Sequence, residues 1–487
     1  MIHLIIFIPL LFALIGLALR GQARATLSIF AALSSFALTL VVWIAKIDTP
    51  FRTPWIPGAG IFYSVSFDGA SLLLALVASL MTAITLIYFS SRKDSALAGG
   101  MYPLALTMLT GLLGIFAARD LILFYVFFEA TLIPGLFMLG LYGRKNRVRA
   151  LTKMALYTIF GGLLMLVSII ATKLYTNSPS FDFLELLGRT AQLDLETQTW
   201  LFLGFLAAFA VKLPLFPLHN WLPDFHAENH PSGVADVMGT LYKVGGYGLF
   251  RFAIPLFPAA AQNLQWILMF LAALTALYGA WIAFSSKDFK RLLAYAGLSH
   301  MGLVALGMFS LNPIGMAGAL YLLAFQGVYS SALFLIVGML EERLNTDSHN
   351  ERTTNQALEI GHVRGLAASA PAFAGVALVL WFASIGVPGL AGFIGEFSVF
   401  LGAYQANPWA TALAVATVIA SAAFALTAYQ RTWLEESTTR ITDLQARDWV
   451  VLAPILVVTV FFGVFSGPAL KLLEPSVQAV AGLLGGK

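Results

Sequence analysis

The sequence predicts an all-α, polytopic membrane protein with about 14 transmembrane helices, in a single transmembrane domain over residues 1–487. Hydrophobic residues make up 59% of the chain and charged residues only 11%, with a mean hydropathy of +0.84. Soluble proteins contain roughly 25% charged residues. Apolar stretches of about 17 to 25 residues recur throughout, the length that an α-helix needs to cross about 30 Å of hydrocarbon. The solvent for most of this chain is therefore lipid.

The expected spans follow from cutting the sequence at its charged and Pro/Gly clusters. They cover residues 2–19, 25–46, 70–90, 100–118, 120–142, 153–173, 197–225, 234–257, 263–284, 290–309, 313–340, 366–404, 408–433 and 448–468. The first block has the length of a signal-peptide core, but it lacks a basic start and a small-residue cleavage site, so we expect a span. The polar stretch 341–365 is expected to be a flexible connector.

Lys and Arg residues collect in alternate loops, those that follow the odd-numbered spans. These loops contain Arg20, Arg24, Arg92, Lys93, residues 144–153, residues 287–291, Arg352, Arg364, Arg440 and Arg447. Loops rich in Lys and Arg stay in the cytoplasm. The sequence therefore predicts that both termini lie on the outer side of the membrane.

Two spans are too long and too interrupted to be simple helices. The seventh contains three prolines between residues 200 and 225, and the twelfth contains Gly-Val-Pro-Gly at residues 386–389. These broken helices 7 and 12 are an odd number of spans apart. Spans four to eight (residues 100–257) and nine to thirteen (residues 263–433) can therefore form two inverted five-helix repeats. Broken helices in inverted repeats mark ion sites near the midplane, because freed backbone groups can serve ions and water.

Charged side chains lie deep within several spans. Glu129, Lys212, Lys243 and Glu396 fall near the middle of their spans, and His300 lies in the middle of its own. Each ion at that depth costs about 2.5 to 3.5 kcal/mol on insertion scales. We therefore expect the chain to pair or hydrate these residues.

Two carboxylates and two amines can act as a proton switch. A nearby carboxylate stabilises the ammonium form of a buried lysine and desolvation destabilises it, so that the two effects nearly balance. The lysine releases a proton when the carboxylate moves away and reloads when it returns. The alternative is a set of static salt bridges between helices. The distribution of the charges over several spans, two of them broken, argues against that alternative.

Several polar side chains could carry a proton onward from Lys243 toward Glu396. They are His300, Lys290, Tyr295, Ser299 and Gln326. Histidine titrates nearest neutral pH, so His300 is the natural intermediate, although an interior histidine can also be a static partner of a backbone carbonyl. Lys290 is expected to extend toward the cytoplasm as an interface lysine.

One further polar cluster follows the seventh span. It consists of His219, Asp224, His226, Glu228 and His230. His226 and His230 have the four-residue spacing of a zinc site, but the flanking prolines make a continuous helix doubtful. A hydrated entrance near the cytoplasmic surface is the preferred interpretation, with His219 lying deeper, beside Lys212.

The sequence has no cysteine, which excludes disulfides, thiolate-bound zinc and cysteine-ligated iron–sulfur clusters. We expect no cofactor and no metal on this chain, and any redox chemistry must take place on another chain. No glycine-rich nucleotide motif follows a strand, and the net charge of +4 is spread over loops. Neither nucleotides nor nucleic acid are therefore expected ligands.

Five segments carry a family resemblance that covers most of residues 100–404. They are residues 127–134 (FFEATLIP), 210–226 (AVKLPLFPLHNWLPDFH), 241–251 (LYKVGGYGLFR), 288–301 and 386–397 (GVPGLAGFIGEF). In this order they resemble the antiporter-like chain M, the chain 4 type, of bacterial proton-translocating NADH-quinone oxidoreductase, which is respiratory complex I.

The resemblance implies roles for the buried charges. Glu129 matches the family's switching glutamate and Lys212 its paired lysine in the broken seventh span. Lys243 matches the central relay lysine, His300 the relay histidine and Glu396 the exit glutamate in the broken twelfth span. These are the residues that their depth in the membrane had already singled out.

The resemblance also implies a proton-translocating subunit in the bacterial inner (plasma) membrane, driven by electron transfer elsewhere and without a redox centre of its own. The implied partners are other membrane subunits of the same complex, including homologous antiporter-like chains, together with protons and lipid. The alternative is a subunit of a multi-chain cation/proton antiporter or a membrane-bound hydrogenase. A carrier for small organic substrates lacks support, since no arginine or glycine-rich half-helix is placed for a carboxylate or phosphate.

The sequence departs from the family pattern at three places. Gln326-Gly327 stands where the family usually has His-Gly, and glutamine can hydrogen-bond a water wire but cannot titrate. Residues 229–230 are Asn-His in place of the usual Ala-Pro, and residues 234–235 are Val-Ala in place of Ser-Val. The last two changes leave the route of proton uptake open.

Overall fold

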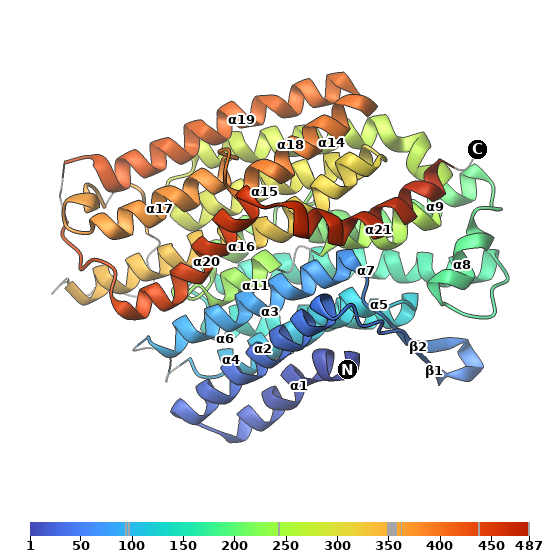
Figure 1. Ribbon diagram of the computed structural model, residues 1–487, viewed down its shortest axis with the longest axis horizontal. Coiled ribbons are helices and arrows are strands. Elements are labelled where there is room, and N and C mark those ends of the chain that lie inside the picture. The colour runs from blue at the N-terminus through green and yellow to red at the C-terminus, as the bar shows by residue number, and fades with distance from the viewer. Residues whose placement is uncertain are drawn as a thin grey trace.

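The computed structural model describes residues 1–92, 95, 98–241, 244–347, 358–361, 363–436 and 439–485. Helices run roughly side by side along the long axis of the molecule (Figure 1). Within the described residues, nine helices are long and apolar enough to cross a membrane, and three shorter apolar helices accompany them. The predicted all-α, polytopic architecture is confirmed, and the number of spans stays a prediction.

The first part of the chain forms eight helices and a two-stranded antiparallel sheet. Its elements are α1 (Ile2–Ala18), α2 (Gly21–Ile44), β1 (Phe51–Ile56), η1 (Pro57–Ala59), β2 (Ile61–Val65), α3 (Gly69–Ser90), α4 (Met101–Ala117), α5 (Leu121–Ala130), α6 (Leu132–Tyr142), α7 (Arg147–Tyr175) and α8 (Phe183–Thr190).

In the second part of the chain, the regular elements among the described residues are all helices, joined by loops. Its elements are α9 (Leu195–Lys212), α10 (Leu222–Glu228), α11 (Val234–Leu241), α12 (Gly245–Gly248), the π-turn η3 (Leu249–Ala253), α13 (Ile254–Leu256), α14 (Pro258–Ser285), α15 (Phe289–Phe309), α16 (Pro313–Asp347), η4 (Leu366–Ala368), α17 (Pro371–Ser384), α18 (Ala391–Ala406), α19 (Pro408–Tyr429), η5 (Gln430–Leu434), α20 (Ala446–Val464) and α21 (Gly467–Leu484).

Aspartates begin three of the long spans. Asp68 accepts a hydrogen bond from the backbone N–H of Ser71 at 3.0 Å in a capping box at the start of α3. Asp120 caps α5 and Asp288 caps α15 in the same way. The first N–H groups of a helix have no partner within it, so these carboxylates stabilise the helix starts.

Both predicted helix breaks are present. The seventh span is divided into α9 and α10, and the twelfth into α17 and α18. In the first break, Trp221 Nε1 donates to the carbonyl of Val211 at 3.0 Å, which provides a partner for a backbone group near the break. In the second break, Gly386 has a φ of +69°, in the left-handed region that favours glycine.

Some elements differ from the expected spans. The sheet, α8 and α21 were not predicted, because they are not apolar stretches of transmembrane length. The helix α16 continues to Asp347, seven residues past the predicted end at 340, so the connector expected over 341–365 begins as helix. Residues 348–357 and 362 of that connector lie outside the described residues.

The loops predicted to be cytoplasmic come together at one end of the bundle. Arg144 pairs with Glu341, and Glu342 pairs with Arg92 at 3.5 Å and with Arg447 at 3.6 Å. Three basic loops that are far apart in the sequence therefore meet at the end of α16. These ion pairs also explain why α16 continues beyond its apolar stretch.

Both chain termini lie on the same side as the sheet. His3 Nδ1 is 3.1 Å from the hydroxyl of Tyr63 in β2, and Gln262 at the start of α14 donates to the carbonyl of Leu484 at 2.8 Å. Figure 1 shows the sheet and the C-terminus at the end opposite the α19–α20 connection. The sheet therefore lies at the end of the bundle opposite the ion-paired basic loops, and the orientation of the termini in the membrane stays a prediction.

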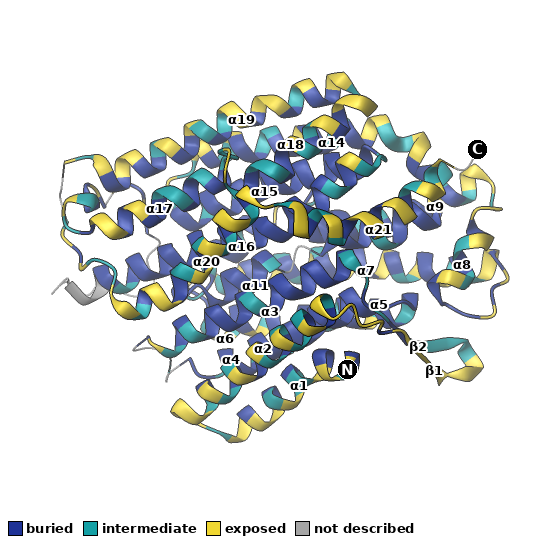
Figure 2. Cartoon of the chain, viewed as in Figure 1, coloured by how far each residue is buried: buried dark blue, intermediate teal, exposed yellow. Residues whose placement is uncertain are grey.

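Burial divides the bundle into inner and outer helices (Figure 2). In the most apolar window of α16 every residue is buried, and 94% are buried in that of α15, against 33% for α2. The outer helices expose large apolar side chains, such as Trp409 and Ile419 on α19. Such contiguous apolar faces fit lipid or neighbouring membrane subunits.

Candidate functional site

The first pair of predicted charges lies where α5 ends and α9 breaks. Lys212 is the last residue of α9 and is 1% exposed. Its Nζ donates to the carbonyl of Phe128 at 3.3 Å and to Thr131 Oγ1 at 3.2 Å, and it lies 4.3 Å from the centroid of the Phe128 ring. Glu129 is close enough to interact electrostatically with Lys212. The C-terminal end of α9 also favours a cation, since its last carbonyls point there.

The Glu129 carboxylate packs against the backbone of α7. A Cβ atom at Gly162 would lie 1.9 Å from Glu129 Oε1, so only glycine leaves room for this oxygen. Oε1 is buried and has no hydrogen-bond partner among the described residues. Leaving a buried acceptor without a partner costs about 1 to 3 kcal/mol. The structure therefore holds this carboxylate in a position where it can still gain a partner.

The second group joins α15 to the break between α17 and α18. His300 is 2% exposed, and its Nε2 lies 2.8 Å from the carbonyl of Ser384, the last residue of α17. The same nitrogen is 3.5 Å from Glu396 Oε1 on α18. The ring therefore contacts a backbone carbonyl and also a titratable carboxylate, and the relay role of His300 stays a prediction.

The break in the twelfth span makes room for the Glu396 carboxylate. A Cβ atom at Gly386 would lie 2.4 Å from Glu396 Oε2. Tyr329 on α16 packs edge-on against His300, with ring centroids 5.8 Å apart, and its buried hydroxyl has no hydrogen-bond partner among the described residues. Tyr329 is therefore a polar group at this site that the sequence did not single out.

Lys243 lies outside the described residues, but the helix that follows it is described. This helix, α12, contacts both α9 and α15. The eighth span therefore runs between the helix that carries Lys212 and the helix that carries His300. Gln326, on the neighbouring α16, donates to Ser330 Oγ at 2.9 Å.

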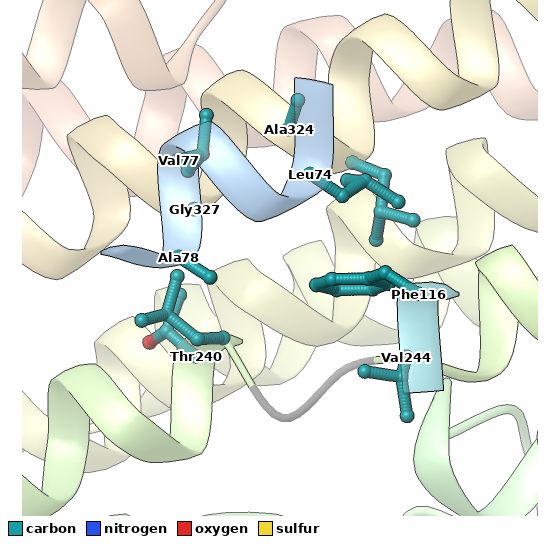
Figure 3. Close-up of a pocket in the computed structure, with 10 residues that line it drawn as sticks. Leu74, Val77, Ala78, Phe116, Thr240, Val244, Ala324 and Gly327 are labelled. Atoms are coloured by element: carbon teal, nitrogen blue, oxygen red, sulfur yellow. The ribbon is translucent and has the colours of Figure 1, made fainter. Parts of the chain in front are cut away.

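A small cavity lies next to the same segment, between α3, α11 and α16 (Figure 3). It encloses about 20 Å³, and Thr240 is the one polar side chain among the described residues that line it. The Thr240 hydroxyl donates to the carbonyl of Asp236 at 3.0 Å. A cavity of this size has room for about one water, but water needs two to four polar partners. The described lining is therefore too apolar to hold a chain of water by itself.

A third buried group was missed in the sequence. Asp236, in the first turn of α11, is 0% exposed and accepts from Lys290 Nζ at 2.7 Å. Its other oxygen lies 3.0 Å from His226 Nδ1 and accepts from the Asn229 side chain at 3.0 Å. We call Asp236, Lys290, His226 and Asn229 the Asp236 cluster. The sequence did contain a signal for this group, because Asp236 is an acidic residue at the third position of the predicted span 234–257.

The expectation that Lys290 extends toward the cytoplasm is wrong. Lys290 is 1% exposed and donates to the carbonyls of Asn229 at 3.2 Å and His230 at 3.1 Å, in addition to its ion pair with Asp236. A buried ammonium needs a carboxylate and further acceptors to offset its desolvation, and this site supplies both. Lys290 therefore belongs to the interior of the bundle.

The polar cluster after the seventh span is divided in the structure. Asp224 pairs with Lys153 at 2.6 Å and with Arg291 at 2.9 Å, whereas His219 is buried and stacks on the ring of Phe216. His226 lies within α10, which ends before His230, so the two do not share a helix. No group of three or more potential metal ligands is found in the part of the chain that the structure describes.

The fold and these groups define a polytopic membrane protein with ionisable residues in its interior, including a pair at each of two helix breaks. Residues 118–421 match the family described as NADH:quinone oxidoreductase/Mrp antiporter, TM. The chain therefore belongs to this family of antiporter-like membrane subunits.

Individual relatives place the chain more closely within the family. It is 49% identical over 489 residues to NADH-quinone oxidoreductase subunit 13 of Thermus thermophilus, with 100% of both chains covered. It is 36% identical over 441 residues to NADH-quinone oxidoreductase subunit M of Rhodobacter capsulatus, covering 87% of this chain and 82% of that one. It superimposes with a TM-score of 0.92, at 47% identity and 100% coverage of both chains, on a chain of respiratory complex I from T. thermophilus with bound NADH. The resemblance to the M-type subunit of NADH-quinone oxidoreductase is confirmed.

Proposed function

We propose that this chain carries protons across a bacterial inner membrane as a non-redox subunit of NADH-quinone oxidoreductase, driven by electron transfer in other subunits. The observation that carries the proposal is that each helix break holds an interacting pair of ionisable groups, of which Lys212, His300 and Glu396 are buried and Glu129 is partly buried. Lys212 ends α9 within electrostatic range of Glu129. His300 lies 3.5 Å from Glu396 beside the break that follows α17.

The first pair supplies the switch. Glu129 Oε1 has no hydrogen-bond partner among the described residues, so the carboxylate can turn toward Lys212 without breaking a bond at that oxygen. Its approach stabilises the ammonium form of the lysine and its withdrawal favours proton release. We assign Glu129 as the switching glutamate and Lys212 as the lysine that loads and releases the proton.

The second pair supplies the exit. Lys243 is assigned as the central relay lysine on the span between Lys212 and His300. His300 Nε2 lies between the Ser384 carbonyl and Glu396, at 2.8 and 3.5 Å, so a small rotation of the ring transfers its contact to the carboxylate. Imidazole can donate and accept a proton near neutral pH. Glu396 then passes the proton toward the outer side.

The chain requires a partner that supplies energy. Moving one proton against 100 mV requires about 2.3 kcal/mol, and we assign no redox cofactor to this chain. The partners are other membrane subunits of the complex, including homologous antiporter-like chains, with lipid covering the remaining outer faces. The two broken spans support two inverted repeats over residues 100–257 and 263–433. We place both termini on the outer side, where the positive-inside rule puts them.

The test is to tag this chain, extract native membranes in mild detergent and purify the tagged material. NADH-dependent quinone reductase activity and a flavin should co-purify with the chain. Recovery of the chain with hydrogenase subunits, or with antiporter-like chains alone, would overturn the proposal that electron transfer from NADH to quinone drives it.

Gly162→Ala is expected to lower NADH-driven proton translocation several-fold with normal assembly. The new methyl group overlaps the position of Glu129 Oε1, so it displaces the carboxylate without removing its charge. Translocation can be followed with a pH-sensitive dye in inverted membrane vesicles. Gly375→Ala is the matched control, because a Cβ atom there meets nothing within 4 Å. Equal rates in the two variants would contradict the position assigned to Glu129.

Glu396→Gln is also expected to lower NADH-driven proton translocation several-fold. Some translocation should remain, because exits can be shared with neighbouring chains. Glutamine keeps the size of the side chain near His300 but cannot carry a proton. The same vesicle assay measures the effect, with NADH oxidation recorded in parallel. Wild-type translocation would show that the exit lies elsewhere.

A further inference from the structure

A polar cavity lies at the turn between α1 and α2 and shares no described lining residue with the two helix-break sites or the Asp236 cluster. It encloses about 390 Å³. Arg20, Gln22 and Arg24 line one side, and Ser90 and Ser95, from the end of α3 and the loop after it, line another. No carboxylate is among its lining residues in the described part of the chain. The described lining thus presents two positive charges and several neutral hydrogen-bonding groups.

The positive charge of this cavity is not neutralised within the described chain. Arg24 Nε donates to the carbonyls of Gly16 at 2.9 Å and Leu19 at 2.8 Å, which holds the turn, and Arg20 makes no hydrogen bond to the described residues. Three buried arginines near this end of the bundle differ. Arg144 pairs with a carboxylate, as do Arg92 and Arg343. The α1–α2 turn is therefore suited to an external anion.

The neighbouring surface is apolar. Leu14 and Leu17 on α1 are 59% and 64% exposed, and Phe30 on α2 is 57% exposed. The sequence predicts that both helices are membrane spans, so we expect their exposed faces to meet acyl chains or other apolar surfaces. A ligand with an anionic head in the cavity and apolar chains along α1 and α2 would match both features.

We propose that this cavity binds the phosphate-bearing headgroup of an anionic phospholipid. Basic pockets between transmembrane helices on the cytoplasmic side are suited to such headgroups, and the sequence predicts that this end is cytoplasmic. Arg20 supplies a free guanidinium and Gln22 an amide donor. The Ser90 and Ser95 hydroxyls, which now donate to backbone carbonyls at 2.8 Å, can rotate toward phosphate oxygens. Inorganic phosphate could make the same polar contacts as a phospholipid headgroup, but it would make no contact with the apolar faces of α1 and α2.

The test is native mass spectrometry of the purified complex, from which this chain is released by collisional activation with its bound lipid. The delipidated complex is titrated with phosphatidylglycerol or phosphatidylcholine. Arg20→Gln should raise the concentration of phosphatidylglycerol needed for the first adduct by about tenfold, because one charge-assisted hydrogen bond is lost. Phosphatidylcholine should bind more weakly than phosphatidylglycerol to the unaltered chain.

Arg149→Gln is the matched control, since Arg149 is exposed at the start of α7 and does not line the cavity. Arg20 is preferred to Arg24 as the test position because Arg24 also holds the turn. Equal binding by the Arg20→Gln and unaltered chains, or an equal loss in Arg149→Gln, would overturn the proposal. Displacement of the lipid by millimolar inorganic phosphate would identify a free anion as the ligand and would also overturn it.

Discussion

Glu129→Gln and Lys212→Ala are each expected to abolish most NADH-driven proton translocation, while the complex still assembles. The first removes the movable charge and the second removes the group that it controls. Losing a proton-transfer group typically lowers a rate by about 10²-fold or more, so residual translocation should fall below about a tenth of wild type. Coupled NADH oxidation should fall as well, because electron transfer cannot proceed freely when protons are not moved.

Inverted membrane vesicles allow both quantities to be measured on the same sample, with a pH-sensitive dye for translocation and NADH absorbance for electron transfer. Glu435→Gln is a suitable control, since Glu435 pairs at 3.3 Å with the half-exposed Arg364 in a surface salt bridge. Surface pairs contribute about 0 to 1 kcal/mol, so this variant should behave as wild type. Full translocation by either the Glu129 or the Lys212 variant would contradict the switch assignment.

Asp236→Asn is expected to destabilise the chain strongly. It leaves the Lys290 ammonium buried without its carboxylate, and breaking a buried ion pair in this way costs about 3 to 5 kcal/mol. The midpoint of thermal unfolding and the amount of chain recovered in the complex should both decrease. Lys290→Met in the Asp236→Asn background should restore much of that stability, because the double variant has no uncompensated charge.

The double variant also separates a structural from a functional role of the Asp236 cluster. We predict that the cluster also serves proton uptake, because Lys290 shares α15 with His300 and Asp236 lies on α11, which precedes Lys243 in the sequence. Asp236→Asn with Lys290→Met should therefore recover stability without recovering translocation. Recovery of both would make the Asp236 cluster a purely structural ion pair.

The local sequence was sufficient to predict that the chain is a membrane protein, where the two helix breaks lie, and which charged residues lie deep within their spans. Apolar length is a property of a contiguous segment, and the prolines and glycines that interrupt a helix act on their own backbone. The depth of Glu129, Lys212 and Glu396 within their spans follows from counting residues. The family resemblance in the same segments then agreed with the comparisons over the whole chain.

Tertiary structure alone decided which groups meet. Lys290 and Asp236 are 54 residues apart in the chain, and His300 and Ser384 are 84 apart, so no local pattern identifies either contact. The burial of Lys290 depends on the carboxylate and carbonyls that α10 and α11 bring to it, and without them the lysine would extend to water as the sequence suggested. The end of α16 likewise depends on arginines from three other loops. Pairings of this kind arise from packing, because a buried charge is stable only where distant segments supply its partners.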